Sequence, residues 1–256
     1  MTLTSYGKRE WGSALIAFFL IFSICVTTAV FKILHPYIAC VITFFTALFC
    51  FAVCAFFRNP HRTIASDKTA IVSPADGVIK DIESLKSESL ENDDLRNLFR
   101  GSDVIRIGIF LSVFNVHLNR APWDINVSFK RYKPGKYLDA RHPNAGKENE
   151  SMLIGGICPL DGEVFPLAVK QVSGAIARRI VCPVNAGETY SRGQIYGMIK
   201  FGSRTELYIP AGMGIDVAVN VGDSVRAGSS PIALIRPEAK VKFHKRTVET
   251  STKVMS

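Results

Sequence analysis

Gly202 and Ser203 form a dipeptide whose chemistry depends on the backbone around it. They lie between two runs rich in β-branched and aromatic residues, 194–201 and 205–209, which predict short strands separated by a bend. In a distorted bend, the Ser203 hydroxyl can attack the carbonyl carbon of Gly202 and convert the peptide bond into an ester. β-Elimination then breaks the chain, and the new N-terminal residue hydrolyses to a pyruvoyl group, a ketone electrophile. Because Gly-Ser is also a common turn dipeptide, this hypothesis needs support from elsewhere in the chain.

Two further residues could assist such a serine. A serine hydroxyl needs a base to take its proton, and histidine titrates near neutral pH, so His117 is a candidate. A carboxylate can orient a histidine ring and stabilise its charged form, as in hydrolase triads, and Asp76 is the candidate for that role. Taken singly, Asp76 also fits a turn residue before Gly77, and His117 fits a hydrogen-bonded residue at a strand end.

The elements that must position these residues are strands. Residues 104–113 form a strongly β-patterned run that leads into His117, and residues 71–79 are typical of a strand, a turn and a second strand. Similar short runs continue to residue 236, without the helix–strand alternation of a doubly wound sheet, so we expect a mainly β (α+β) domain. Residues 217–233 resemble the V-x-x-G-D-x-V-x-x-G segment of lipoyl- and biotinyl-type domains but lack their modified lysine. They predict a barrel-sandwich-hybrid-like C-terminal part rather than a swinging-arm carrier.

The N-terminal region is predicted to anchor the chain in a membrane. Residues 11–31 and 37–57 are uncharged apolar runs, each long enough for a transmembrane helix of about 20 residues. Basic residues flank the pair at both outer ends, against one lysine in the connecting loop, so both chain termini are expected in the cytoplasm. We therefore expect three regions: a two-helix anchor at residues 1–57, a catalytic domain at residues 58–237 and a basic, disordered tail at residues 238–256.

The charge of the chain and the spacing of its cysteines and histidines indicate which binding partners, redox compartment and metal sites to expect. The net charge of +9 accompanies no nucleic-acid-binding motif, so anionic lipid head groups are the favoured partner and nucleic acid is not. The six cysteines show neither a disulfide framework nor metal-ligand spacing, which is typical of a reducing compartment. No metal site is predicted, because the histidines have no partners at ligand spacing.

Four segments together resemble the phosphatidylserine decarboxylases, specifically the short bacterial and archaeal type. They are residues 57–60 with 73–77, residues 110–122, residues 171–181 and residues 201–204. The resemblance extends from about residue 58 to residue 235. It implies cleavage between Gly202 and Ser203 into chains 1–202 and 203–256, with Ser203 becoming a covalent pyruvoyl cofactor. It also implies catalytic roles for His117 and Asp76.

The resemblance is less specific for substrate contacts. Arg178 and Arg179 could pair with the lipid phosphate or the serine carboxylate, or they could be solvated surface charges. Asn149 and Glu150 are similar to an Asn-Glu-Arg segment of the short subfamily, although a serine follows them here. Longer relatives have a second histidine three places after the first, where this chain has Arg120.

The sequence thus predicts a self-processing, pyruvoyl-dependent decarboxylase at the cytoplasmic face of the cell membrane. It would convert phosphatidylserine to phosphatidylethanolamine and CO2 through a Schiff base. One alternative is a decarboxylase of another serine lipid, such as an archaetidylserine. The other is a non-catalytic β module tethered to the membrane. A homo-oligomer is compatible with all three.

Overall fold

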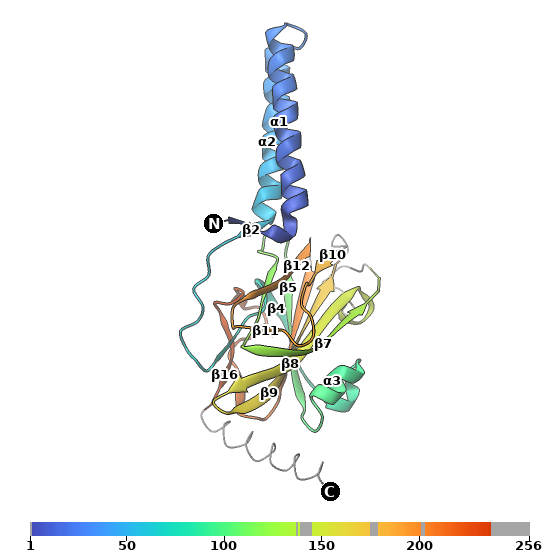
Figure 1. Cartoon of the computed structure of the whole chain (residues 1–256), viewed down its shortest axis with the longest axis vertical. Helices are drawn as coiled ribbons and strands as arrows, with labels where there is room; N and C mark the ends of the chain where they lie inside the picture. Colours follow the sequence, from blue (N-terminus) through green and yellow to red (C-terminus); the bar gives the residue numbers. More distant parts are fainter. Residues whose placement is uncertain (1, 137, 139–144, 175–178, 201–202, 237–256) are drawn as a thin grey trace. The chain divides into compact units, whose positions relative to one another are not determined.

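The computed structural model describes residues 2–136, 138, 145–174, 179–200 and 203–236 (Figure 1). By its internal contacts the chain divides into two units, residues 1–61 and residues 62–256. The first unit is a helical hairpin, and the second is a mainly β domain that carries every predicted site residue. The prediction of a mainly β fold preceded by two apolar helices is confirmed.

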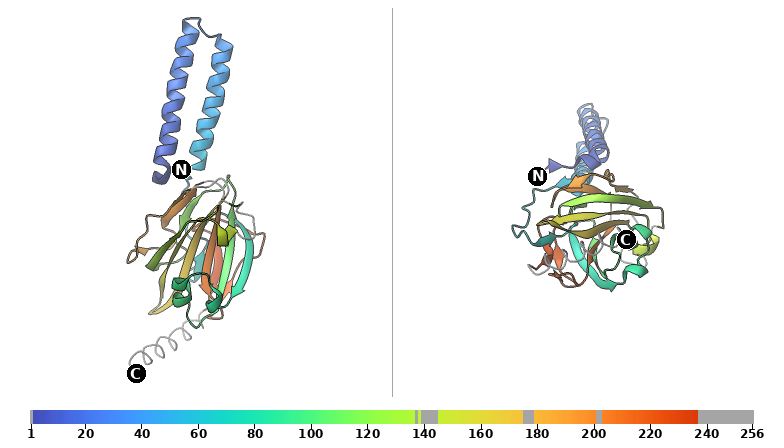
Figure 2. Two further views of the ribbon diagram at one scale, coloured as in Figure 1. Left: turned by 90° about the vertical axis from the view of Figure 1, so that its right-hand side faces the viewer. Right: turned by 60° about the horizontal axis from the view of Figure 1, so that its bottom comes forward.

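The helical hairpin consists of α1 (Lys8–Val30) and α2 (Pro36–Phe56), which lie side by side and antiparallel (Figures 1 and 2). Pro36 occupies the first turn of α2, where its missing N–H costs nothing, and the His35 side chain accepts a hydrogen bond from Tyr37 N. A short 3-10 turn, Ser5–Gly7, precedes α1, and β1 (Thr2–Leu3) pairs with β2 (Arg58–Asn59). The two ends of the hairpin are therefore joined at its base.

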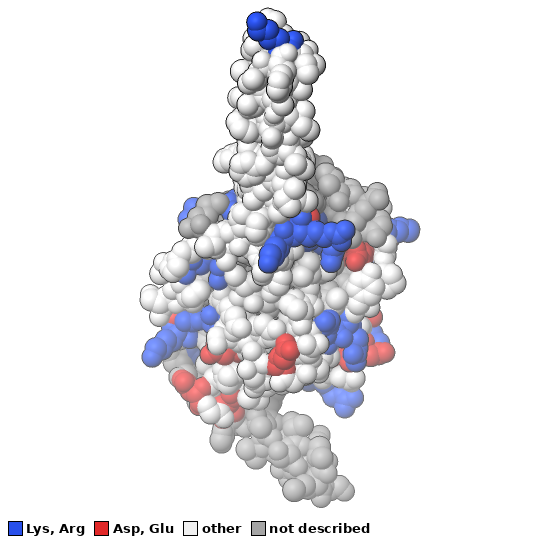
Figure 3. All heavy atoms as spheres, turned by 45° about the horizontal axis from the view of Figure 1, so that its top comes forward, with Lys and Arg blue, Asp and Glu red and all other residues white. Residues whose placement is uncertain are grey.

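The hairpin surface is apolar. Side chains such as Phe19 and Phe45 are more than half exposed, and the charged residues of α1 are confined to its first three positions. Figure 3 shows a shaft without charged atoms below the blue ones at the turn. Exposed apolar area on this scale requires a nonaqueous or protein partner. By length and composition both helices are able to cross a membrane.

The β domain is built on an eight-stranded antiparallel sheet in the order β11-β7-β8-β9-β13-β5-β4-β15, which curls around its core (Figure 2). In that order the bounds are Thr189–Tyr190, Ile125–Lys133, Ser151–Leu160, Glu163–Ser173, Ser203–Pro210, Val104–Leu111, Gly77–Leu85 and Ser224–Val225.

Two three-stranded sheets accompany the large sheet. One has the order β10-β12-β6 (Arg179–Val181, Ile195–Lys200, Leu118–Arg120), and the other has the order β14-β16-β3 (Ile215–Val217, Pro231–Ile235, Ala70–Val72). The segment expected to resemble a barrel-sandwich hybrid contributes to two sheets, because β14 pairs with β16 whereas β15 pairs with the start of β4.

The faces of the large sheet differ in chemistry. Along β13, Leu207 and Ile209 point into the main apolar core, which also holds Trp123 and Phe165. On the other face, the connection between β4 and β5 covers a smaller apolar cluster that includes Tyr208. That connection carries a 3-10 turn (Ser87–Ser89) and α3 (Asp93–Leu98), and a further short helix, α4 (Ala145–Glu148), precedes β8.

A buried charge network lies on this second face beside the apolar cluster. The Glu206 carboxylate is fully buried, accepts hydrogen bonds from Arg204 Nε at 2.8 Å and Tyr208 Oη at 2.7 Å, and lies 3.7 Å from Arg106 Nη1. Burial alone would raise the pKa of Glu206, but the positive charges of Lys170, Arg204 and Arg106 outweigh it and lower the pKa. The carboxylate therefore stays ionised inside the fold.

We expect Glu206→Gln to lower the free energy of unfolding by about 3–5 kcal/mol, because it leaves buried cations uncompensated. A carboxylate with a lowered folded pKa contributes stability above its unfolded pKa and loses it as pH falls through the folded value. The difference in the free energy of unfolding between wild type and variant should therefore be constant above about pH 4.5 and shrink below it. Chemical denaturation of the detergent-solubilised chain across pH measures this. Glu88→Gln, at an exposed position, should leave the pH dependence of the unfolding free energy unchanged. If the loss caused by Glu206→Gln did not depend on pH, Glu206 would not be the ionised group with a lowered pKa.

Candidate active site

The register of the large sheet gathers the motif segments at one end. Ser203, the first residue of β13, pairs with Leu111, the last residue of β5, and with Ser173, the last residue of β9. Val78, at the start of β4, pairs with Phe110, so residues 73–77 arrive at the same end. We call this end, where β13 begins, the Ser203 end of the sheet.

The chain passes from one sheet to another between β12 and Ser203, and we call this passage the crossing. β12 ends at Lys200 in a three-stranded sheet, and β13 begins at Ser203 in the eight-stranded sheet. The two strands expected around the Gly-Ser pair are present, but they do not pair with each other, so an ordinary hairpin turn is excluded. Gly202 itself lies outside the described residues. Ser203 is fully buried, and its Oγ has no hydrogen-bond partner among the residues that the structure describes.

Further polar groups are buried beside Ser203. The Oγ of Ser173 and Oε2 of Glu150 also lack partners within the described ranges. Asn149 Nδ2 donates to the Ser173 carbonyl oxygen at 2.7 Å, and Ser173 N donates to the Glu150 carbonyl oxygen at 2.9 Å. Asn149 and Glu150 are therefore fixed next to the strand that pairs with Ser203. Buried polar atoms without partners cost about 1–3 kcal/mol each, which favours a functional role for this cluster.

His117 is buried just before β6. Its Nδ1 lies 3.0 Å from the carbonyl oxygen of Asn115, so Nδ1 carries the proton and donates, leaving the lone pair of a neutral ring on Nε2. Its own carbonyl oxygen accepts from Ile199 N at 3.1 Å, which places His117 beside the end of β12. Residue 117 thus borders the crossing that leads to Ser203.

Asn119 connects three of the motif segments and was not identified from the sequence. Its side chain is fully buried; Nδ2 donates to Thr205 Oγ1 at 3.1 Å and to the Pro74 carbonyl oxygen at 3.4 Å, and Oδ1 accepts from Gln171 Nε2 at 2.8 Å. The only sequence signal was its position two residues after His117. Asn119 holds β13, β9 and the residue 73–77 turn in one arrangement.

Asp76 pairs with arginine rather than with histidine. Its Oδ2 lies 2.6 Å from Arg62 Nη2, and its Oδ1 accepts from Ala227 N at 2.8 Å; among the described residues these are its partners, and His117 is not one. Arg120, in the place of the second histidine, donates to the Gly193 carbonyl oxygen. The pKa of Arg120 is lowered by burial and by the positive charge of Arg62, and the negative charge of Asp76 opposes this only in part. Asp76 is therefore paired with Arg62 and acts on Arg120 through its charge.

Arg179 is exposed at the start of β10, where it pairs with Lys200, and Arg178 lies outside the described residues. Arg179 thus borders the same crossing as His117. The structure brings Ser203, Asn149, Glu150, His117 and Arg179 to this end of the domain.

Arg204, directly after Ser203, anchors the start of β13 from the opposite face. Its two Nη atoms lie 2.7 and 2.6 Å from the two carboxylate oxygens of Asp81 on β4. Burial opposes the charge of Arg204, but hydrogen bonding to Asp81 and the charge of Glu206 raise its pKa. This network was missed in the sequence because nothing in the spacing of Asp81 and Glu206 indicates that they meet.

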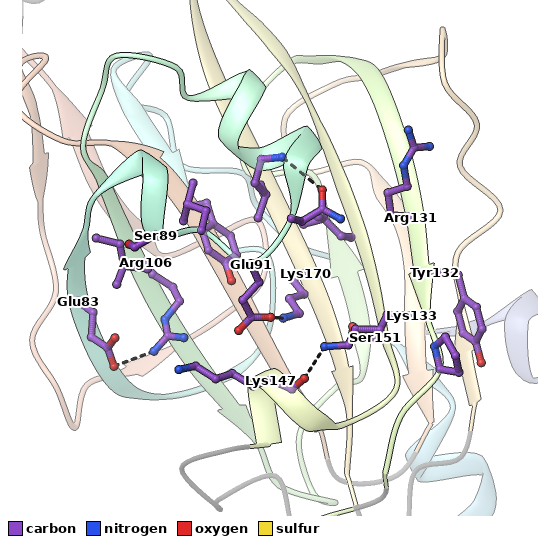
Figure 4. A pocket seen from close by; sticks show the side chains of 17 residues that line it. Glu83, Ser89, Glu91, Arg106, Arg131, Tyr132, Lys133, Lys147, Ser151 and Lys170 are labelled. Carbon is purple, nitrogen blue, oxygen red and sulfur yellow. Dashed lines mark hydrogen bonds and ion pairs between the residues drawn. The ribbon is translucent and has the colours of Figure 1, made fainter.

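A pocket of about 550 Å³ lies on that opposite face, lined in part by Glu83, Arg106, Lys133 and Lys170 (Figure 4). Two ion pairs lie within its wall, Arg106 with Glu83 at 2.7 Å and Lys170 with Glu91 at 3.2 Å. Lys170 and Tyr208 alternate along their strands with Gln171 and Leu207, which point into the core. The pocket and the Ser203 side chain therefore occupy different faces of the sheet.

A comparison with known proteins gives the family. The model of the family described as phosphatidylserine decarboxylase matches residues 49–233, which contain all four motif segments. A phosphatidylserine decarboxylase proenzyme of Rhodopirellula baltica is 40% identical over 179 residues, 70% of this chain and 69% of the relative. Proenzymes of the same name from Geotalea daltonii and Carboxydothermus hydrogenoformans are 41% and 40% identical and cover 68% and 74% of this chain, and 75% and 82% of their own. The chain belongs to the phosphatidylserine decarboxylase family of enzymes.

We expect Asn119→Ala to lower the free energy of unfolding by about 1–3 kcal/mol for each buried group left without its partner, chiefly Thr205 and Gln171. Chemical denaturation of the solubilised chain measures the loss. Asn220→Ala, at an exposed position, is the matched control and should leave the denaturation curve unchanged. Equal curves for both variants would show that Asn119 does not hold the strands together.

We expect Asp76→Asn and Arg62→Gln to act as one unit. Each should destabilise the fold, and the double variant should lose less than the sum, with a coupling of about 0.5–3 kcal/mol, because both single changes break the same largely buried pair. A double-mutant cycle in denaturant measures the coupling. The exposed pair of Lys86 and Asp103 is the control, with coupling near zero expected. Additive effects at residues 62 and 76 would exclude a shared role.

Proposed function

We propose that the chain is a proenzyme that cleaves itself between Gly202 and Ser203 and then decarboxylates phosphatidylserine to phosphatidylethanolamine. The observation that carries this proposal is the position of Ser203, buried at a crossing between two sheets where the motif segments meet. The relatives named phosphatidylserine decarboxylase proenzyme support both the precursor state and the substrate.

Self-cleavage uses groups of this chain. The Ser203 Oγ attacks the carbonyl carbon of residue 202, the Ser203 nitrogen leaves as an amine, and an ester joins the two parts. Loss of the Ser203 α-proton then expels the residue 202 carboxylate, and water replaces the nitrogen as ammonia is released, leaving a ketone at residue 203. The buried Oγ without a described partner suits this attack, because no hydrogen bond to a described residue has to be broken first.

His117 is the proposed base. Since Nδ1 donates to the Asn115 carbonyl oxygen, Nε2 is the nitrogen that can receive a proton, and the ring orientation is fixed by that hydrogen bond. Asp76 cannot orient this ring directly in the described arrangement, because its carboxylate is held by Arg62 and Ala227. Its proposed role is to fix the turn of residues 73–77, from which the Pro74 carbonyl accepts from Asn119 and from Arg120 N.

The buried polar cluster fits a pyruvoyl group at residue 203. The Oγ of Ser173, which pairs with residue 203, and Oε2 of Glu150, which directly precedes β8, lie at the same end of the sheet, whereas the Ser203 Oγ leaves with the residue 202 carboxylate. When formed, the group supplies a ketone that withdraws electrons from the substrate's α-carbon as CO2 leaves. His117 is the candidate to deliver the proton that replaces CO2. Arg179, exposed beside the crossing, is the candidate partner for the lipid phosphate or carboxylate.

The proposed site of action is the cytoplasmic face of the cell membrane. The two apolar helices supply the anchor, and the basic residues that flank them favour this orientation. Decarboxylation of an archaetidylserine would use the same groups, since the reacting serine head is identical. A β module without catalytic activity would instead leave the chain uncut.

We expect an intact-mass spectrum to show fragments 1–202 and 203–256, with borohydride reduction shifting the mass of the second fragment because its N-terminus is a ketone. Ser203→Ala should remain one chain and lack decarboxylase activity, whereas Ser89→Ala, an exposed serine near α3, should process fully. A single unmodified 28.2 kDa chain from active membranes would overturn the mechanism.

A further inference from the structure

The connection between β5 and β6 displays two large apolar side chains to solvent. Phe114 is 83% exposed and Val113 is 41% exposed, in a domain whose other large apolar residues are mostly buried. We call these two residues the hydrophobic tip. Transfer of such exposed apolar surface from water to an apolar environment is favourable, so the tip is suited to an apolar partner.

A hydrogen-bonded turn carries the hydrophobic tip. Both N and Oγ of Ser112 donate to Asn115 Oδ1 at 2.8 Å, and Asn115 N donates to the Ser112 carbonyl oxygen at 3.0 Å. The Asn115 carbonyl oxygen in turn accepts from His117 Nδ1. The turn therefore presents residues 113 and 114 outward in a fixed conformation, connected to His117 by a hydrogen bond.

The position of the hydrophobic tip is at the Ser203 end of the sheet. Leu111, which pairs with Ser203, lies just before it in the chain, and His117 lies just after it. Any surface that covers the tip is therefore close to the crossing where Ser203 is buried. A lipid head group must reach this crossing for the proposed reaction to occur.

Exposed cations at the Ser203 end of the sheet suit an anionic surface. Exposed cations stand at the same end of the sheet: Lys133 at the end of β7, Lys147 in α4 and Arg179 at the start of β10. Apolar and aromatic side chains flanked by cations are typical of segments that enter the head-group region of a bilayer.

We propose that Val113 and Phe114 insert into the interfacial region of an anionic bilayer and hold the Ser203 end of the sheet against the lipid head groups. This inference rests on the proposed function for its purpose, but its physical content, contact of residue 114 with lipid, does not. We choose a lipid surface as the occupant because the same chain carries two helices able, by length and composition, to cross a membrane, which would tether the domain to a bilayer. A second protein covering the tip is the alternative that the test excludes.

The test uses fluorescence quenching by lipid. The full chain carrying Phe114→Trp is reconstituted in vesicles of phosphatidylcholine and phosphatidylglycerol, with and without bromine on the acyl chains. The signal of the parent chain, which contains Trp11 and Trp123, is subtracted. We expect brominated lipid to quench Trp at position 114. The matched control is Val164→Trp, 43% exposed at the opposite end of β9, and should not be quenched.

Equal quenching at both positions, or none at position 114, would overturn the inference. Cross-linking of position 114 to a second chain without bromine quenching would also overturn it and assign the tip to a protein contact. The measurement can be made on a Ser203→Ala background, so it stands even if the chain has no decarboxylase activity. A lack of activity together with quenching would remove the proposed function alone.

Kinetics give a second readout. Phe114→Ser should raise the KM for phosphatidylserine in vesicles about tenfold, because partial burial of a phenylalanine is worth about 1.4 kcal/mol or more. It should leave autocleavage, kcat and the rate on a short-chain, water-soluble phosphatidylserine unchanged. Val164→Ser is the matched control and should change none of these. Equal losses on vesicle and soluble substrates would contradict lipid insertion and indicate a structural role.

Discussion

The antiparallel pairing of β13 between β5 and β9 is the constraint on which the rest of the site depends. It fixes Ser203 at the end of the sheet, opposite Leu111 and Ser173, and it brings the segments before and after those strands to the same place. Because side chains alternate along a strand, one register also decides which residues point into the core and which join the charge network behind it. A shift by one residue would move Ser203 away from the core and Arg204 into it.

The two faces of β13 therefore carry different kinds of interaction. On the core face, the buried amide of Asn119 joins Thr205 to Gln171, and the start of the strand carries polar groups whose partners the described residues do not supply. On the other face, Arg204 is clamped by Asp81 and Glu206. Buried polar groups without hydrogen bonds to described residues cost stability, and the ion pairs of Arg204, one residue away, oppose this cost and fix the position of the segment.

Sequence periodicity and motif order were sufficient for the fold class, the two apolar helices and the family. Helix α2 begins at Pro36, one residue before the expected start, because proline fits the first turn. The sequence does not show which strands pair, because the alternation of apolar and polar residues indicates that a strand has a buried face but not which strand lies beside it. For that reason β12 and β13 were expected next to each other at a bend, whereas they belong to different sheets. The Arg62–Asp76 pair and the Asp81–Arg204–Glu206 network depend on the same three-dimensional pairing.

The central position of β13 has a consequence for how a cleaved molecule would behave over time. A cut before Ser203 would make β13 the first strand of the shorter fragment, hydrogen-bonded on both sides in the interior of an eight-stranded sheet. Separating the fragments would require breaking both ladders and exposing the core at once, so the barrier to exchange would approach that of global unfolding. The two chains would be partners for the lifetime of the molecule, without a covalent bond between them.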